Sequence, residues 1–244
     1  MDPASTENPF AAATSPPFAA QLHARLRQRI VHGELPPGTR LSEQEIADQY
    51  ALSRQPVREA FIRLAGEGLL EVRPQRGTFV TRIDMEWVLC TQFIRESVES
   101  DIARLAAAQA LPQDHQALFD QIDRQQAETQ PPALVRLDEE FHAMLARIAG
   151  KALVWQHLQQ VKMPLDRARH LLSAMTPREV MLAQHRHLAE AIAARDPDAA
   201  EAAMRQHLRR VLVDLSGVLK LSPDYFIRTE SVAGSAATTP AAPA

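Results

Sequence analysis

The sequence predicts a mainly α-helical protein that contains one small mixed domain and one larger all-helical domain. Two observations favour this fold class. Apolar residues recur at helical spacing through most of the 244 residues, whereas residues 69–80 hold strand-forming residues around a turn. From residue 84 onward the sequence is rich in alanine and leucine and nearly free of glycine. We therefore expect domains at residues 18–82 and 83–222.

Three helices open the first domain. The first is expected over about residues 18–31, where leucine or isoleucine recurs at every fourth position. Ser42 and Glu45 form a capping box, which satisfies free backbone amides at a helix start and opens a short second helix. The third helix is expected to begin at Ser53 or Arg54.

A β-hairpin completes the first domain. It is expected over residues 69–80, with its turn at Pro74–Gly77. In the helix before it, Phe61, Ile62 and Leu64 are expected to belong to the core. Three helices followed by such a hairpin form a winged helix-turn-helix, which places one helix in a major groove of DNA and the wing against the backbone.

The second domain is expected to be an antiparallel all-α bundle of about six helices. Pro164 is expected to kink the fourth of them, because proline lacks the amide hydrogen that a helix needs. Thr176 and Asp196 each precede a proline and mark helix starts. The six helices are expected near residues 84–109, 113–128, 132–149, 152–174, 177–195 and 197–220.

Composition limits the function classes. Residues 1–17 and 223–244 are rich in alanine, proline, serine and threonine, so we expect largely disordered tails. A single cysteine, Cys90, excludes an internal disulfide and a thiolate zinc cluster. Without a secretion signal or a long apolar stretch, the protein is expected in the cytoplasm and away from membranes. The net charge is −3, but residues 18–82 carry ten arginines against seven acidic residues, which suits a DNA-binding module on an acidic body.

The start of the third helix holds the candidate DNA-binding residues. Arg54 and Arg58 lie four residues apart on one helix face. Arginine can bind the edge of guanine or grip a phosphate, and Gln55 could bind adenine. The alternative is that these side chains are simply solvated on the helix surface.

Four polar residues on apolar helix faces form a candidate metal site. Asp138 and His142 are one helical turn apart and point inward, and His185 and His207 lie on the apolar faces of two later helices. Burying four such groups without partners would cost several kcal/mol. One carboxylate and three imidazoles suit Zn, Ni, Fe or Mn. The alternative is a buried hydrogen-bond network between the aspartate and the histidines with no metal.

The first domain closely resembles the winged-helix domain of the GntR family of bacterial regulators, in the branch with a FadR-type C-terminal (FCD) domain. The resemblance implies that Arg54 and Arg58 contact operator DNA and that Arg76 and Gly77 form a wing tip in the minor groove. Gln44 stands where some members carry a DNA-contacting arginine. The matching segments are Leu35–Leu41 (LPPGTRL), Glu45–Ala47 (EIA), Leu52–Ala60 (LSRQPVREA), Glu67–Leu70 (EGLL) and Arg76–Val80 (RGTFV).

The second domain resembles the FCD domain itself. By that resemblance one aspartate and three histidines bind a divalent metal at the base of a ligand cavity, and small carboxylates are the usual ligands. Arg95 stands where the family often has an arginine near the cavity, so it is expected to pair with the effector; a surface salt bridge to Glu99 is the alternative. Ala149–Lys151 departs from the family, which usually has asparagine there. The matching positions are Asp138, His142, His185, Leu188, Ile192, Asp196, Ala199, His207 and Leu208.

The resemblance implies a ligand-responsive transcription regulator. Its partners would be palindromic operator DNA, a small carboxylate such as a sugar acid or hydroxy acid, and a second copy of the chain, because two-fold dimers bind palindromes. A repressor is the expected activity. The alternative is an all-α metal-dependent hydrolase fused to a DNA-binding module, since a metal with an open position can activate water. No nucleophile or acid-base group accompanies the site, so no catalytic residue is expected.

Overall fold

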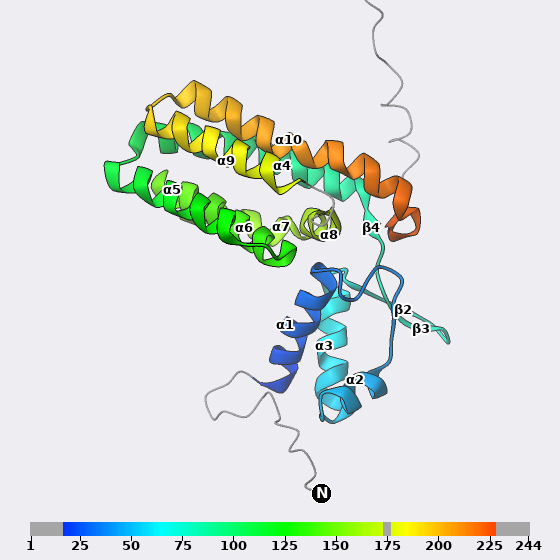
Figure 1. Cartoon of the computed structure of the whole chain (residues 1–244). Helices are drawn as coiled ribbons and strands as arrows, with labels where there is room; N and C mark the ends of the chain where they lie inside the picture. The colour runs from blue at the N-terminus through cyan, green and yellow to red at the C-terminus, as the bar shows by residue number, and fades with distance from the viewer. Residues whose placement is uncertain (1–16, 173–176, 228–244) are drawn as a thin grey trace, which may run out of the picture. The chain divides into compact units, whose positions relative to one another are not determined.

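The computed structural model describes residues 17–172 and 177–227 (Figure 1). The chain divides between Arg82 and Ile83 into two compact units, each with its own core. The mainly α-helical fold class predicted from the sequence is confirmed. None of the described helices combines the length and apolar character that a membrane crossing needs.

The first unit contains three helices and a small antiparallel sheet. Ser42 caps the second helix, where its hydroxyl accepts a hydrogen bond from the amide of Glu45 at 3.4 Å. The sheet has the strand order β1-β3-β2. The elements are α1 (Phe18–Val31), β1 (Arg40–Leu41), α2 (Glu43–Gln49), α3 (Arg54–Gly66), β2 (Leu70–Arg73) and β3 (Gly77–Val80).

The core of the first unit lies between α1, α3 and the sheet. Phe61 and Leu64 are buried in it, as expected, but the prediction for Ile62 was wrong, because its side chain is 64% exposed. The helical repeat explains this difference. Residues 61 and 64 are three apart and share a face, whereas residue 62 is turned about 100° away from residue 61.

The hairpin turn between β2 and β3 depends on a glycine. Gly77 has a φ of 109°, which side-chain-bearing residues rarely adopt, and a Cβ atom at this position would lie 2.9 Å from Nε of Arg40. The turn is closed by the amide of Arg76, which donates to the carbonyl of Arg73 at 3.0 Å. Only glycine therefore fits here without strain.

The second unit is a helical bundle with a short pair of strands. In it α10 packs along α4 and α9, and α6 packs against α4 and α5 (Figure 1). Its core is built mainly from leucine, alanine and isoleucine on the facing sides of these helices. The elements are β4 (Ile83–Asp84), α4 (Met85–Gln109), α5 (Pro112–Ala127), α6 (Pro131–Ile148), α7 (Ala152–Val161), α8 (Met163–Leu172), α9 (Arg178–Ala193), α10 (Pro197–Leu221), a 3-10 turn (Pro223–Tyr225) and β5 (Phe226–Ile227).

The predicted fourth helix of the bundle, 152–174, is two helices in the structure. Helix α7 ends at Val161, Lys162 caps it, and α8 begins at Met163. Pro164 thus lies in the first turn of a new helix, where its missing amide hydrogen costs nothing, and it does not kink a continuous one. Seven α-helices of this unit therefore lie in the described part of the chain, rather than the six expected. The end of the predicted helix falls outside the described residues.

The second unit also extends beyond residue 222, where the sequence predicted a tail. Strand β5 runs parallel to β4, with Phe226 opposite Ile83 and Ile227 opposite Asp84. Phe226 is 3% exposed and packs in a small apolar cluster with residues of β4, α4, α8 and α10. A buried aromatic residue binds this short segment to the unit despite the polar composition around it.

Candidate metal centre and nucleic-acid interface

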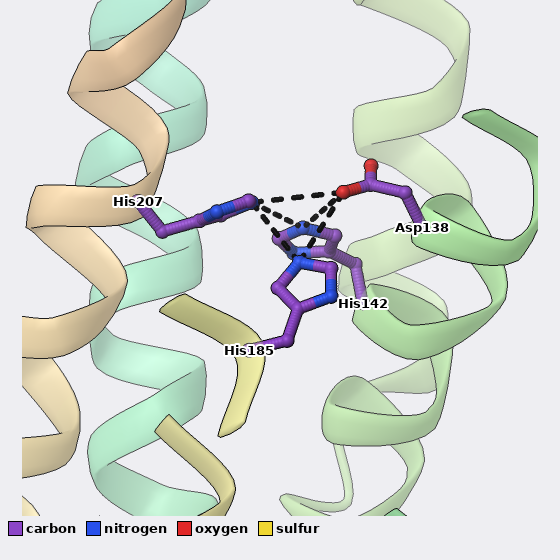
Figure 2. Close-up of side chains that lie close together, drawn as sticks. All are labelled: Asp138, His142, His185 and His207. Atoms are coloured by element: carbon purple, nitrogen blue, oxygen red, sulfur yellow. Dashed lines mark hydrogen bonds and ion pairs between the residues drawn. The ribbon is translucent and has the colours of Figure 1, made fainter. Parts of the chain in front are cut away.

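Four polar side chains meet in the interior of the second unit. Asp138 and His142 come from α6, His185 from α9 and His207 from α10, and they point toward one another (Figure 2). One ligand atom from each residue lies within 4.8 Å of the other three. The structure therefore brings together the four residues that the sequence singled out.

Helix geometry explains why these side chains converge. The two residues of α6 are one turn apart, and each directly follows a buried apolar residue, Leu137 or Phe141. Their partners lie on the buried faces of their own helices, His185 beside Leu188 and His207 beside Leu208. All four side chains are at most 9% exposed. The apolar packing of three helices thus fixes the polar centre.

Five distances within the centre are close to those between ligands of one metal ion. A tetrahedral ion with bonds of about 2.0–2.1 Å separates its ligand atoms by about 3.3 Å. Nε2 of His207 lies 3.2 Å from Nε2 of His142 and 3.4 Å from Nε2 of His185. Oδ1 of Asp138 lies 3.3 to 3.8 Å from all three of these nitrogens.

The second ring nitrogen of each histidine faces an oxygen atom. Such outer partners fix the orientation and the tautomer of a metal-binding imidazole. The partners are Glu99 Oε2 at 2.5 Å from Nδ1 of His142, Gln125 Oε1 at 2.7 Å from Nδ1 of His185, and Gln184 Oε1 at 3.1 Å from Nδ1 of His207.

These contacts indicate where the ring protons lie. A hydrogen on each Nδ1 faces an oxygen atom that can accept it, and each neutral ring then has an unprotonated Nε2. Gln125 supports this assignment, because its Nε2 donates to the carbonyl of Leu137 at 3.3 Å and its oxygen is left for His185. Three nitrogen lone pairs and one carboxylate oxygen therefore face one another. The donor set fits a divalent cation.

The pKa shifts make a metal-free network harder to satisfy. Burial, together with the other two imidazoles, lowers the pKa of His207 well below its usual value, and burial lowers the pKa of His185. Burial alone would also lower the pKa of His142, but the carboxylates of Glu99 and Asp138 outweigh it and raise the pKa. The lowered pKa values favour neutral rings at His185 and His207, whose Nε2 atoms lie 3.4 Å apart, and two such lone pairs need a cation or a shared proton between them.

The other oxygen of Asp138 is paired with Arg169 of α8, which also pairs with Glu139. Burial alone would raise the pKa of Asp138, but the guanidinium of Arg169 and the imidazole of His142 hold it well below its ordinary range. Asp138 is therefore ionised, as a metal ligand must be.

A cavity of about 100 Å³ adjoins the centre. Asp138 and His207 form part of its wall, so two candidate ligands border the open space. Four arginines also line it, together with apolar side chains of α6, α9 and α10. The four guanidinium groups outnumber the two carboxylates of the lining, Asp138 and Asp214, so the charged lining favours an anion beside the candidate metal. The four arginines are Arg95, Arg169, Arg178 and Arg210.

The position of Arg95 combines features of both expectations from the sequence. Its Nε pairs with Oε1 of Glu99 at 2.5 Å, but this salt bridge is buried, with both side chains 3% exposed, and does not lie on the surface. Arg95 also borders the cavity, and its Nη2 atom has no hydrogen-bond partner in the described structure. Glu99 in turn contacts His142, so Arg95 reaches the centre through one carboxylate.

Sequence reasoning missed the partners around the four ligands. Glu99 and Gln125 had a usable signal, because both stand at inward positions of apolar helix faces. Gln184 is the residue before His185 and gave no such signal. Arg169 was also missed, since nothing in the sequence places α8 beside α6.

The candidate DNA-binding residues are exposed on the first unit. Arg54 and Gln55 lie in the first turn of α3, and Arg58 follows one turn later. Nη2 of Arg54 contacts Oε2 of Glu43 at 3.3 Å, and the amide of Gln55 donates to Glu59 at 2.9 Å. The side chain of Arg58 makes no hydrogen bond or ion pair with any residue that the structure describes.

The wing carries the other two candidates. Arg76 is exposed in the turn between β2 and β3, directly before Gly77. Beside the turn, Arg73 lies over the ring of Phe79, 4.8 Å from its centroid, and pairs with Glu71 at 2.8 Å. These contacts keep Arg73 against the hairpin, whereas Arg76 extends from its tip.

Comparison with protein families gives two matches that follow one another along the chain. Residues 18–80 match the family of bacterial regulatory proteins named gntR, and residues 92–210 match the FCD domain. The chain belongs to the GntR family. The resemblance noted from the sequence is thereby confirmed for both parts of this GntR regulator.

Curated relatives support the same assignment over nearly the whole GntR regulator. The HTH-type transcriptional repressor RspR of Escherichia coli K12 is 37% identical over 86% of this chain and 94% of its own length. An HTH-type transcriptional regulator of Streptomyces ambofaciens is 39% identical over 90% of this chain and 91% of its own length. The protein is thus a transcriptional regulator and not an enzyme.

Solved structures share the fold of this GntR regulator. McbR/YncC of E. coli covers 83% of the chain and 99% of its own length, with a TM-score of 0.65 and 20% identity. A GntR protein of Rhodococcus sp. RHA1 covers 82% and 97%, with a TM-score of 0.63 and 23% identity. The pairing of a winged helix-turn-helix with a helical domain is therefore the fold of known GntR proteins.

Proposed function

We propose that this regulator is a repressor that binds a palindromic operator as a homodimer and responds to a small carboxylate bound at a metal centre. The observation that carries the proposal is the cavity beside the four convergent ligand atoms. Two of the four ligands and four arginines border the same space. An anion with two oxygens can bind a metal and a guanidinium at once.

Asp138, His142, His185 and His207 would hold the metal, which is Zn, Ni, Fe or Mn in this proposal. A bound divalent ion supplies positive charge and free coordination positions for carboxylate oxygens. The chain's own residues orient the imidazoles, and the four ligand side chains are buried and at most 9% exposed to solvent. Arg95 would bind the effector through its free nitrogen at the cavity wall.

The DNA contacts would be made by α3 and the wing. Arg54, Gln55 and Arg58 would face base edges and phosphates in the major groove, and Arg76 with Gly77 would enter the minor groove. Their exposure supports this role. Repression is supported by the printed name of the relative RspR, and sugar acids or hydroxy acids remain our proposed effectors.

A homodimer would form on an apolar face of the second unit. Helix α4 exposes several large apolar side chains on adjoining turns. Among them, Trp87 is 61% exposed and Phe93 is 73% exposed. Monomeric proteins seldom expose such contiguous apolar groups. A two-fold contact through one face of α4 would cover the same residues in both copies.

A thermal melting screen tests this proposal. Small hydroxy acids and sugar acids are added to the protein with and without a chelator, and the unfolding temperature of the second unit is followed. A ligand at 100 times its dissociation constant stabilises by about 2.7 kcal/mol. We expect a stabilising shift with one class of acid that disappears with the chelator. Melting that is indifferent to every acid and to the chelator would contradict both the metal and the carboxylate.

A further inference from the structure

Helix α8 has two faces with different partners. Its polar face carries Arg169, whose guanidinium pairs with Asp138 and with the neighbouring Glu139. Its apolar face carries Leu165, Ala168 and Leu172, which are at most 2% exposed. One face therefore contacts the metal centre, and the other contacts a different part of the second unit.

The polar face is anchored by a network of buried charges. Lys162, which precedes α8, lies 2.8 Å from Glu139 and 2.6 Å from Asp166, and its side chain is 3% exposed. The side chain of Arg169 is only 14% exposed. Buried charges of this kind need their partners, because an unpaired charge in the interior is strongly unfavourable.

The apolar face packs on the point where the second unit begins. Its residues join one cluster with Ile83 of β4 and Phe226 of β5, together with side chains of α4 and α10. The two strands hold each other by parallel pairing. Ile83 directly follows Arg82, the last residue of the first unit, so β4 is the strand at which the chain enters the second unit, and β5 pairs with it.

A helix of ten residues is too short to be stable in isolation, so contacts on its two faces must hold α8 in place. A change at one face therefore alters the packing at the other. Helices α4 and α10 also touch α8, and they meet the centre through Glu99 and His207, but the contact between α8 itself and a candidate ligand is made by Arg169. Arg169 is the specific connection between the centre and α8 among the described residues.

We propose that Arg169 is a positioning residue that couples the metal centre to the β4–β5 strand pair through α8. A metal or an anion that binds Asp138 or Glu139 changes the ion pairs of these residues with Arg169. The change alters the packing of α8 and therefore the stability of the strand pair. Which metal or anion binds at the centre rests on the function proposed above. The connection from the centre through Arg169 and α8 to the strand pair does not rest on it.

Hydrogen exchange of the full chain tests the connection directly. Arg169→Gln removes the ion pairs, and we expect about tenfold faster exchange in α8 and also in the amides of residues 83–85 and 223–227. The matched control is Arg124→Gln. Arg124 of α5 pairs at 3.0 Å with Glu140 of α6, the helix that also carries Asp138 and Glu139, but the side chain of Arg124 is 60% exposed. Faster exchange in α8 alone, with the strand pair unchanged, would overturn the proposal.

A second measurement keeps the proposal testable if Arg169→Gln does not fold. Coupling between two sites is reciprocal, so a change that loosens the buried packing of the strand pair must alter the metal centre. We expect Phe226→Ala to weaken Zn²⁺ binding, measured by calorimetry on chelator-stripped protein, by about tenfold. Ile227→Ala, whose side chain is 47% exposed, should leave it unchanged.

The two measurements separate the possible failures. Equal Zn²⁺ affinities in wild type, Phe226→Ala and Ile227→Ala would overturn the coupling while leaving the metal site in place. Absence of Zn²⁺ binding in the wild type would contradict the metal in the proposed function, and the exchange of Arg169→Gln would still decide the coupling.

Discussion

The candidate metal centre of the second unit and the candidate DNA-binding arginines of the first unit hold their polar side chains in opposite ways. At the centre, Asp138 and the three histidines are buried, and each has a partner beyond the other ligands. On the first unit, the side chains of Arg58 and Arg76 are exposed and make no hydrogen bond or ion pair with a described residue.

This difference determines how each role can be inferred. A buried polar group must be satisfied, so its neighbours reveal what it can bind. An exposed arginine is satisfied by water, so its surroundings say little, and its role is inferred from the family to which the chain belongs. If this comparison holds, metal binding depends on each of the four buried ligands and on their partners. The exposed arginines, in contrast, can be replaced without loss of the fold.

Removal of one buried ligand should have the largest effect. We expect His185→Ala to lower metal affinity by more than about 100-fold, above the range for outer partners of a metal site. Metal content after dialysis, measured by mass spectrometry, checks this prediction. His187→Ala on the same helix is the control, because that side chain is exposed. Equal metal content in both variants would contradict the assignment.

Removal of an outer partner should have a smaller effect. In Gln125→Ala, His185 loses the acceptor that lies 2.7 Å from its Nδ1. We expect metal affinity to fall by about 10- to 100-fold, as is typical for such partners. Gln116→Ala on the exposed face of the same helix is the control. If Gln125→Ala binds metal as wild type does, the tautomers are not set by these oxygens.

Removal of an exposed arginine should leave the fold intact and weaken only DNA binding. We expect Arg58→Ala to cost about 1–3 kcal/mol of operator affinity if the side chain binds a base edge. Arg63→Ala, which removes an exposed arginine from the same helix, is the control for charge alone. Titration of operator DNA at fixed salt gives the affinities. Equal losses in the two variants would show that Arg58 contributes only general attraction to DNA.

Much of the fold could be predicted because its signals are local. The capping residue Ser42, the turn at Gly77 and the apolar stripes of α6, α9 and α10 each act within a few residues of sequence. The inward positions of Asp138, His142, His185 and His207 follow from the same stripes, so the candidate ligands could be found without coordinates.

The remaining features depend on contacts between distant segments. Arg169 meets Asp138 only because α7 and α8 are separate helices, and whether Pro164 kinks one helix or begins another is not decided by its neighbours in sequence. The burial of Phe226 likewise depends on β4, almost the whole length of the second unit away in sequence. Such pairings have no periodicity that a sequence pattern could show.

The pairing of β4 with β5 has a consequence for synthesis on the ribosome. The first unit has all its residues, and can fold, once Arg82 has left the exit tunnel. The second unit cannot close its strand pair until Phe226 has emerged, because the two strands lie at opposite ends of that unit's sequence. For most of translation, the nascent chain therefore carries a complete first unit and an incomplete second unit. Until the last residues of the second unit emerge, its apolar surfaces are exposed unless chaperones cover them.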